Sequence, residues 1–273
     1  MVFFAANSLL ARLALRDGEI DGGSFTAVRI AAGAAVLSLL VSLRAEGLSS
    51  LRHHGSWGAA AALFGYAITF SLAYLWLEAS TGALILFASV QIAMTTAGLL
   101  RGERPRATDW AGMALALSGL VYLLSPGLTR PSPAGALLMA VSGFAWGCYS
   151  LAARTARSPT IATAGNFVRA SSMAAAVLVA VWATGRAHAS AAGLELAIVS
   201  GGVTSGLGYV IWYVALRDLT ATRAAIAQLT VPVIAAAAGV LLLQEPMTWR
   251  LVLAGAAILG GVALALSGKR PTI

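Results

Sequence analysis

The sequence has 273 residues, of which 59% are hydrophobic and only 10% are charged, and its mean hydropathy is +0.84. Soluble domains carry about 25% charged residues, so this composition excludes a water-soluble globular protein. The net charge of +8 does not require a nucleic-acid partner, and we expect none, because excess basic residues in a membrane protein mark its cytoplasmic loops.

Apolar stretches of the length that crosses a bilayer, about 17–25 residues, follow one another along the whole chain. The predicted spans are roughly 1–15, 25–43, 57–77, 82–100, 109–125, 134–152, 164–184, 194–215, 223–243 and 250–268. The first is short, and Pro232 is the only proline inside a span. The period-two alternation of barrel strands is absent. The sequence therefore predicts an all-α integral membrane protein with ten transmembrane helices.

The distribution of basic residues predicts the orientation of these helices. With a cytoplasmic N-terminus, the inside segments hold eleven basic residues: Arg44, Arg52, Arg101, Arg104, Arg106, Arg154, Arg157, Arg217, Arg223, Lys269 and Arg270. The outside segments hold four: Arg16, Arg130, Arg186 and Arg250. We therefore expect both termini in the cytoplasm and, for a bacterial chain, a location in the inner membrane.

The second half of the sequence repeats the first. "LLRGERPRATDWAG" (99–112) resembles "LLLQEPMTWRLVLAG" (241–255), and "NSLLAR" (7–12) resembles "YSLAAR" (149–154). We predict one five-helix repeat over 1–125, a linking loop over 126–133 and a second repeat over 134–273. An odd number of helices inverts the second copy in the membrane, and such inverted repeats around a central cavity are typical of secondary transporters.

These segments resemble the EamA-type members of the drug/metabolite transporter superfamily. The resemblance is carried by "GERPRATDWAG", by "QEPMTWRLVLAG" and most specifically by "ALRDLTATRAAIAQLTVPVIAAAAGVLLLQEP" (215–246), and it extends over nearly the whole chain. It implies that the first four helices of each repeat surround a central cavity, and many relatives export amino acids or related metabolites. The first repeat departs from the second by having Gln91 where the second has Pro232.

Aromatic residues at helical spacing are the first candidates for the cavity wall. They are Tyr74, Tyr209, Trp212 and Tyr213. Helix packing or an aromatic belt at the membrane boundary is the alternative interpretation.

The first helix of each repeat carries a second group of candidates. Phe4, Asn7 and Ser8 correspond to Trp146, Tyr149 and Ser150, and we predict substrate contacts for Phe4, Asn7, Ser8, Trp146 and Tyr149. The polar members avoid lipid, so an interior position is expected, although hydrogen bonds between helices alone would explain it.

The fourth helix of each repeat adds Gln91, Gln228 and Pro232. Pro232 removes a helical hydrogen bond and is expected to kink its helix, which suggests a role in gating. Gln91 and Gln228 could bind a zwitterionic solute, and Gln91 could instead join two helices.

Arg29 and Arg169 occupy equivalent positions near the beginning of the second helix of each repeat. Their long side chains could reach the membrane surface, or they could pair with the carboxylate of a substrate.

The chain has no residue pattern that indicates catalysis. All ten acidic residues fall in predicted loops or at helix ends, and there is no phosphate-binding GxxxxGK[ST] loop and no HExxH motif. We expect no enzyme activity, no metal and no cofactor. The favoured hypothesis is a carrier, monomeric or weakly dimeric in membrane lipid, that exports small zwitterionic or neutral metabolites, most of all amino acids, by alternating access. The alternatives are a carrier of phosphorylated or nucleotide-sugar solutes and a membrane scaffold that transports nothing.

Overall fold

The computed structural model describes residues 1–16, 18–43, 47–77, 79–127, 131–154, 156–242 and 246–267. Its helices are α1 (Val2–Arg16), α2 (Gly22–Ser42), η1 (Leu48–Arg52), α3 (Trp57–Ala73), α4 (Ala79–Leu100), α5 (Ala107–Leu124), η2 (Ser125–Gly127), α6 (Pro133–Ala153), α7 (Pro159–Ala183), α8 (Ala191–Val199), η3 (Ser200–Leu207), α9 (Gly208–Leu216), α10 (Ala221–Gln228), α11 (Thr230–Leu242) and α12 (Trp249–Ser267).

Each apolar stretch identified in the sequence is helical. Within the described ranges, eight helical segments are long and apolar enough to cross a membrane, and Val2–Leu15 and Trp57–Ala73 are shorter apolar helices. The described part of the chain contains no strand beyond an isolated bridge between Ile20 and Ala189. The chain is therefore an all-α protein with the helices of a multi-pass membrane protein.

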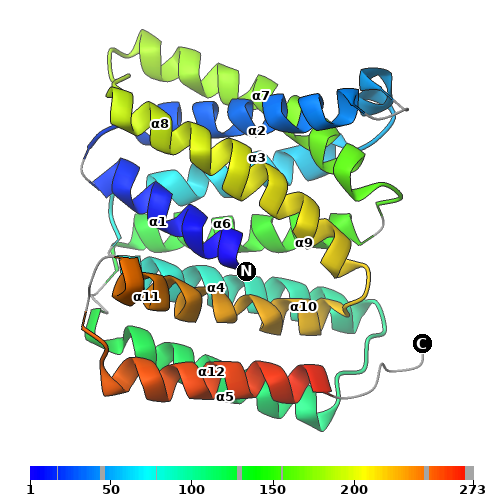
Figure 1. The fold of residues 1–273 in the computed structure, drawn as a ribbon, viewed down its shortest axis with the longest axis vertical. Coiled ribbons are helices and arrows are strands. Elements are labelled where there is room, and N and C mark those ends of the chain that lie inside the picture. The colour runs from blue at the N-terminus through cyan, green and yellow to red at the C-terminus, as the bar shows by residue number, and fades with distance from the viewer. Residues whose placement is uncertain are drawn as a thin grey trace.

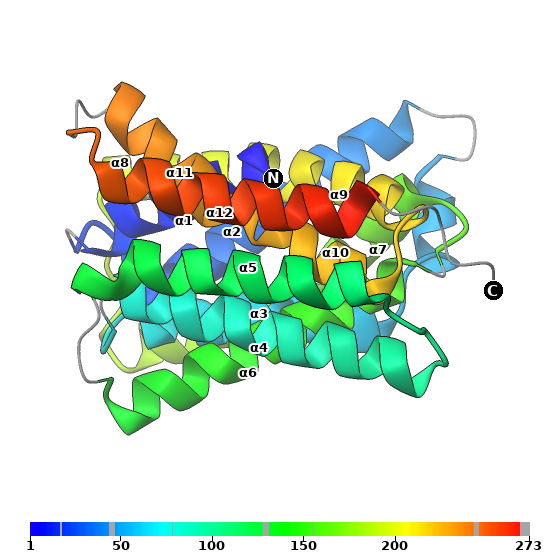
Figure 2. The same ribbon diagram turned by 90° about the horizontal axis from the view of Figure 1, so that it is seen from below.

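The helices lie side by side in a stack along the long axis of the molecule (Figure 1). α2 packs on α7 at one end of the stack, α5 packs on α12 at the other, and α4 packs on α10 between them. Figure 2 shows that α3, α4, α5 and α6 lie on one side of the molecule, while α8, α9, α11 and α12 lie on the other. The first helix of each half crosses to the opposite half, because α6 packs on α3 and α4 while α1 packs on α8, η3 and α11.

The loop before α2 is joined to the loop before α8. The Asp21 carboxylate caps α2 by accepting hydrogen bonds from the N–H groups of Gly23 (3.0 Å) and Ser24 (2.9 Å), and it also accepts one from His188 N–H (3.1 Å). Burial would raise the pKa of Asp21, but these hydrogen bonds outweigh burial and lower the pKa. The carboxylate is therefore held in its charged form, and it fixes both the beginning of α2 and the neighbouring loop.

Two of the membrane-spanning segments change geometry along their length. Residues 191–216 begin as α8, pass through the π-helical turn η3 and continue as α9. Residues 221–242 are interrupted at Leu229, where α10 ends and α11 begins. Pro232, three residues further on, has no N–H group to donate to the carbonyl of Gln228, which accounts for the interruption.

Candidate substrate cavity

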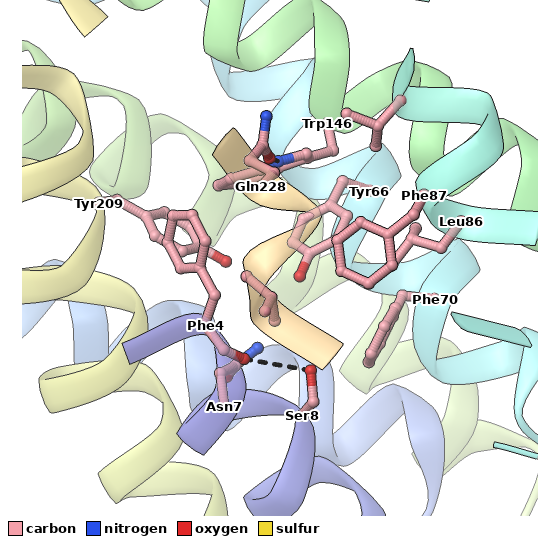
Figure 3. Close-up of a pocket in the computed structure, with 12 residues that line it drawn as sticks. Phe4, Asn7, Ser8, Tyr66, Phe70, Leu86, Phe87, Trp146, Tyr209 and Gln228 are labelled. Atoms are coloured by element: carbon pink, nitrogen blue, oxygen red, sulfur yellow. Dashed lines mark hydrogen bonds between the residues drawn. The ribbon is translucent and has the colours of Figure 1, made fainter. Parts of the chain in front are cut away.

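A small cavity lies between the two sides of the stack, as the close-up shows (Figure 3). Its volume is about 40 Å³, enough for ~3 water molecules. Its walls come from α1, α3, α4, α6, α9, α10 and α11 and consist of Phe4, Asn7, Ser8, Tyr66, Phe70, Leu86, Phe87, Val90, Trp146, Tyr209, Gln228 and Val231. Both halves of the chain thus contribute to the cavity, and it must widen before it can hold a metabolite.

Six of the twelve residues in the wall are aromatic. The Phe4 ring meets Trp146 edge-on with centroids 5.3 Å apart, and it meets Tyr209 and Trp212 at 5.7 and 5.8 Å. On the other side, Tyr66 contacts both Trp146 (4.9 Å) and Phe70 (5.7 Å). Such contacts stabilise the wall, and the rings offer an apolar surface to a solute.

Uncharged polar groups interrupt the aromatic wall. Asn7 Oδ1 accepts hydrogen bonds from Ser200 Oγ (2.7 Å) and Thr204 Oγ1 (3.2 Å), both of which belong to η3. Trp146 Nε1 donates to Gln228 Oε1, and Ser8 Oγ donates to the carbonyl of Phe4 (Figure 3). The bonds of Asn7 join α1 to η3 of the other half, the bond of Trp146 joins α6 to α10 within the second half, and the bond of Ser8 stays within α1.

Arg29 lies behind the wall and is only 2% exposed. Its Nε donates to Ser205 Oγ (2.9 Å), and its Nη2 donates to the hydroxyl oxygens of Tyr209 (2.7 Å) and, more weakly, Tyr66 (3.5 Å). The guanidinium also lies 5.5 Å from the centroid of the Tyr66 ring. The charge is therefore buried next to two tyrosines that line the cavity.

The structure separates the predicted site residues into two sets. Those that line the cavity are Phe4, Asn7, Ser8, Trp146, Tyr209 and Gln228. Those that lie outside its lining are Tyr74, Gln91, Tyr149, Trp212 and Tyr213.

The residues of the second set make contacts between helices. Gln91 is buried and donates from Nε2 to the carbonyl of Ala225 (2.7 Å), which joins α4 to α10. Trp212 donates from Nε1 to Ser150 Oγ (3.1 Å), and Tyr213 donates to the carbonyl of Tyr149. Tyr74, at the end of α3, packs edge-on against Phe70. In this conformation these residues pack helices together around the cavity.

Arg169 differs from its repeat partner Arg29 in its surroundings. Its Nη1 donates to the carbonyls of Leu51, His54 and Gly165, and its Nη2 donates to the carbonyl of Arg52. The guanidinium thus holds the segment around η1 against α7, with Nη1 and Nη2 engaged by these four backbone carbonyls.

Several residues of the wall were not among the sequence candidates. They are Tyr66, Phe70, Leu86, Phe87, Val90 and Val231. Tyr66 could have been found, because Tyr66, Phe70 and Tyr74 form a ladder at the helical spacing of four. The aliphatic members carry no comparable signal, since most residues in these helices are apolar.

From the cavity to the end of α6, successive turns of that helix bind to other helices. Trp146 binds Gln228 of α10, Ser150 binds Trp212 of α9, and Arg154 Nη1 donates to Glu103 Oε1 (2.8 Å).

Glu103 also caps α10, because its carboxylate accepts hydrogen bonds from the N–H groups of Ala221 (2.8 Å) and Thr222 (3.3 Å). Nearby, Arg223 Nε donates to Asp109 Oδ1 (3.1 Å) in a buried ion pair. These contacts join α6, α9, α10 and the segment around Glu103 between the cavity and this end.

No metal-binding cluster is found in the described ranges, where no three His, Cys, Asp or Glu side chains lie close enough together to hold an ion.

Comparison with known proteins places the chain in a family. The EamA-like transporter family matches residues 1–125 and 133–267. The uncharacterized protein PA1977 of Pseudomonas aeruginosa (strain PAO1) is 50% identical over 269 residues, which cover 98% of this chain and 92% of that protein. A crystal structure of a protein that is 22% identical superposes with a TM-score of 0.80, over 99% of this chain and 98% of the other, and shows the same fold. The chain belongs to the EamA-like transporter family.

Proposed function

We propose that this membrane transporter exports small zwitterionic or neutral metabolites, most of all amino acids, across the bacterial inner membrane by alternating access. The observation that carries this proposal is the cavity, whose wall combines aromatic rings with the uncharged polar groups of Asn7, Ser8 and Gln228. Such a lining suits a small solute with one apolar part and a few hydrogen-bonding groups. A phosphorylated solute would need several cations, and among the described residues Arg29 is the buried cation beside this cavity.

The proposal includes ten transmembrane helices arranged as two inverted repeats. Packing of the helices supports it, because exchanging the halves reproduces the contacts: α2 meets α7, α5 meets α12, and α1 and α6 each pack on helices of the other half. The two separate stretches matched by the family also fit two repeats. The shorter helices α1 and α3 would then cross the membrane with the others.

Alternating access requires that the cavity be closed on one side at a time. We infer that the hydrogen bonds along α6 and at Arg154 close one side in this conformation: Arg154 to Glu103 joins the two halves, while Trp146 to Gln228 and Trp212 to Ser150 join helices of the second half. We propose that these contacts open when the halves rock and that the interruption of the helix near Pro232 lets α11 move relative to α10.

The proposed orientation puts this closed end in the cytoplasm, as the bias of basic residues predicts. In a Cys148→Ser background, a cysteine introduced at Pro131 should react with an impermeant thiol reagent added outside intact cells. A cysteine introduced at Arg104 should not. The reverse pattern would contradict the orientation.

Transport is tested with purified protein in proteoliposomes. Vesicles loaded with unlabelled amino acids should accumulate labelled amino acid by exchange, and protein-free vesicles should not. Ser8→Trp, which puts an indole into the cavity, should stop exchange in protein that still inserts and remains monodisperse. If the wild-type protein is folded and exchanges no member of an amino-acid panel, the proposed function is wrong.

A further inference from the structure

Arg29 is a buried charge that has no ion-pair partner within the described residues. The other buried arginine, Arg223, is paired with Asp109. A charge removed from water without a counter-charge is costly, and ionisable residues within a membrane usually have a functional role. The position of Arg29 therefore calls for an anion that the described residues do not supply.

The guanidinium has an unused donor. Nε and Nη2 are engaged by Ser205, Tyr209 and Tyr66, but Nη1 is buried and has no hydrogen-bond partner in the part of the chain that the structure describes. The backbone brings Arg29 close to η3, because Gly201 has no side chain and a Cβ there would lie 2.0 Å from the carbonyl oxygen of Arg29. The site is thus built into the contact between α2 and η3.

Tyr66 and Tyr209 connect this charge to the cavity. Arg29 donates to both phenol oxygens, so at each tyrosine the oxygen accepts and the O–H can donate, either to the neighbouring tyrosine or to a solute. Figure 3 shows both hydroxyl groups pointing toward the middle of the cavity. Two hydroxyl groups that can donate hydrogen bonds, next to a positively charged guanidinium, can bind a carboxylate.

The other residues of the cavity wall provide no comparable site for a cationic group. Of the described acidic residues, Glu19, Asp21, Glu103 and Asp218 lie outside the helices, Asp109 lies in the first turn of α5, and Glu195 lies in the second turn of α8. Around the cavity, Phe4, Phe70 and Phe87 offer apolar surface instead. An ammonium group would find no carboxylate there among the described residues.

We propose that Tyr66, Tyr209 and Arg29 form a carboxylate-binding subsite, and that the solutes of this transporter are monocarboxylates with an apolar or aromatic body. The hydroxyl groups of the two tyrosines contact the carboxylate, and Arg29 supplies the charge and orients them. A carboxylate is essential for binding, and an α-amino group is dispensable. This inference rests on the proposed transport function, since it concerns the same cavity.

Three compounds with one aromatic body test the inference: phenylalanine, phenylalanine amide and 3-phenylpropionate. Binding to purified protein is measured as a rise in melting temperature, and transport is measured as inhibition of exchange. Phenylalanine and 3-phenylpropionate should both bind, and the amide should bind at least about tenfold more weakly, because it cannot use a donor pair that favours a charged acceptor. Equal binding of the amide would overturn the inference.

Variants test which side chains produce the preference for a carboxylate over an amide. Arg29→Gln and the double change Tyr66→Phe with Tyr209→Phe should remove the preference for the carboxylate over the amide. Arg29→Lys, which keeps the charge, should keep part of it. Arg169→Gln is the matched control, and it should lower the melting temperature while the preference stays. If Arg29→Gln is folded and retains the full preference, the subsite is wrong; if it does not fold, the Tyr66/Tyr209 variant decides.

The two proposals can fail separately. If phenylalanine is exchanged and phenylalanine amide inhibits this exchange as strongly as 3-phenylpropionate does, the subsite is wrong and the transport function stands. A rise in melting temperature with both carboxylates, without exchange of any solute, would support the subsite and refute the proposed function.

Discussion

Two glutamines, Gln91 and Gln228, are both predicted from the sequence to bind the solute, but their surroundings in the structure differ. Gln91 joins α4 to α10 through the carbonyl of Ala225, whereas Gln228 lines the cavity. Gln91→Met should therefore lower the stability by about 1 kcal/mol, the value of one hydrogen bond, with little change in KM. Gln228→Met should raise the KM for a transported solute. Melting curves and initial exchange rates of both variants check this; an increased KM for Gln91→Met alone would contradict the assignment.

The sequence could predict which residues point inward, but not which of them reach the cavity. A polar or aromatic side chain such as Asn7 or Gln91 avoids lipid for the same reason whether it meets a solute or a neighbouring helix. The difference depends on the partner, and Ala225 cannot be identified as the partner of Gln91 by spacing alone. The partners of Arg29, which lie on α3, η3 and α9, are likewise fixed only by packing.

Among the helices, the contact between α2 and η3 is the one that glycine most clearly determines. A Cβ at Gly201 would lie 2.0 Å from the carbonyl oxygen of Arg29, whereas a Cβ at Gly260 in α12 would meet nothing within 4 Å. Gly201→Ala should push the two segments apart and destabilise the protein by roughly 1–3 kcal/mol or more. Gly260→Ala should be neutral or stabilising by up to about 1 kcal/mol. Equal melting temperatures of the two variants would contradict this packing.

The interruption between α10 and α11 gives a second prediction for an element. Pro232→Ala restores an N–H group that can donate to the carbonyl of Gln228 and so favours a continuous helix. If α11 must move relative to α10 during transport, exchange should slow while membrane insertion and melting temperature are kept. Unchanged exchange rates would limit Pro232 to a role in packing.

The sequence predicts where the helices lie better than it predicts the departures from α-helical geometry within them. Apolar length and proline placement predicted helices where α2, α4 and α12 are found, and Pro232 marked the interrupted segment. The π-helical turn η3 was not predicted, because "SGGVTSGL" differs from other Gly-rich stretches only in what it packs against. That turn supplies Ser200, Thr204 and Ser205 to Asn7 and Arg29, so part of the site depended on an unpredicted feature.

At the scale of the whole molecule, the proposed alternating access requires the cavity to be reached from both sides of the membrane in turn. We propose that this conformation is closed on the side of Glu103, whose carboxylate binds Arg154 and the first turn of α10. Glu103→Gln removes the charge that both partners use and should favour opening on that side.

The most direct measurement is the reactivity of a cysteine in the cavity wall. Ser8→Cys in a Cys148→Ser background, reconstituted in one orientation, is treated with an impermeant thiol reagent from either side of the membrane. We expect labelling from both sides, slowed from both by a transported solute. When Glu103→Gln is added, labelling from the side of Glu103 should become faster. Labelling from a single side, unaffected by solute and by Glu103→Gln, would contradict alternating access through this cavity.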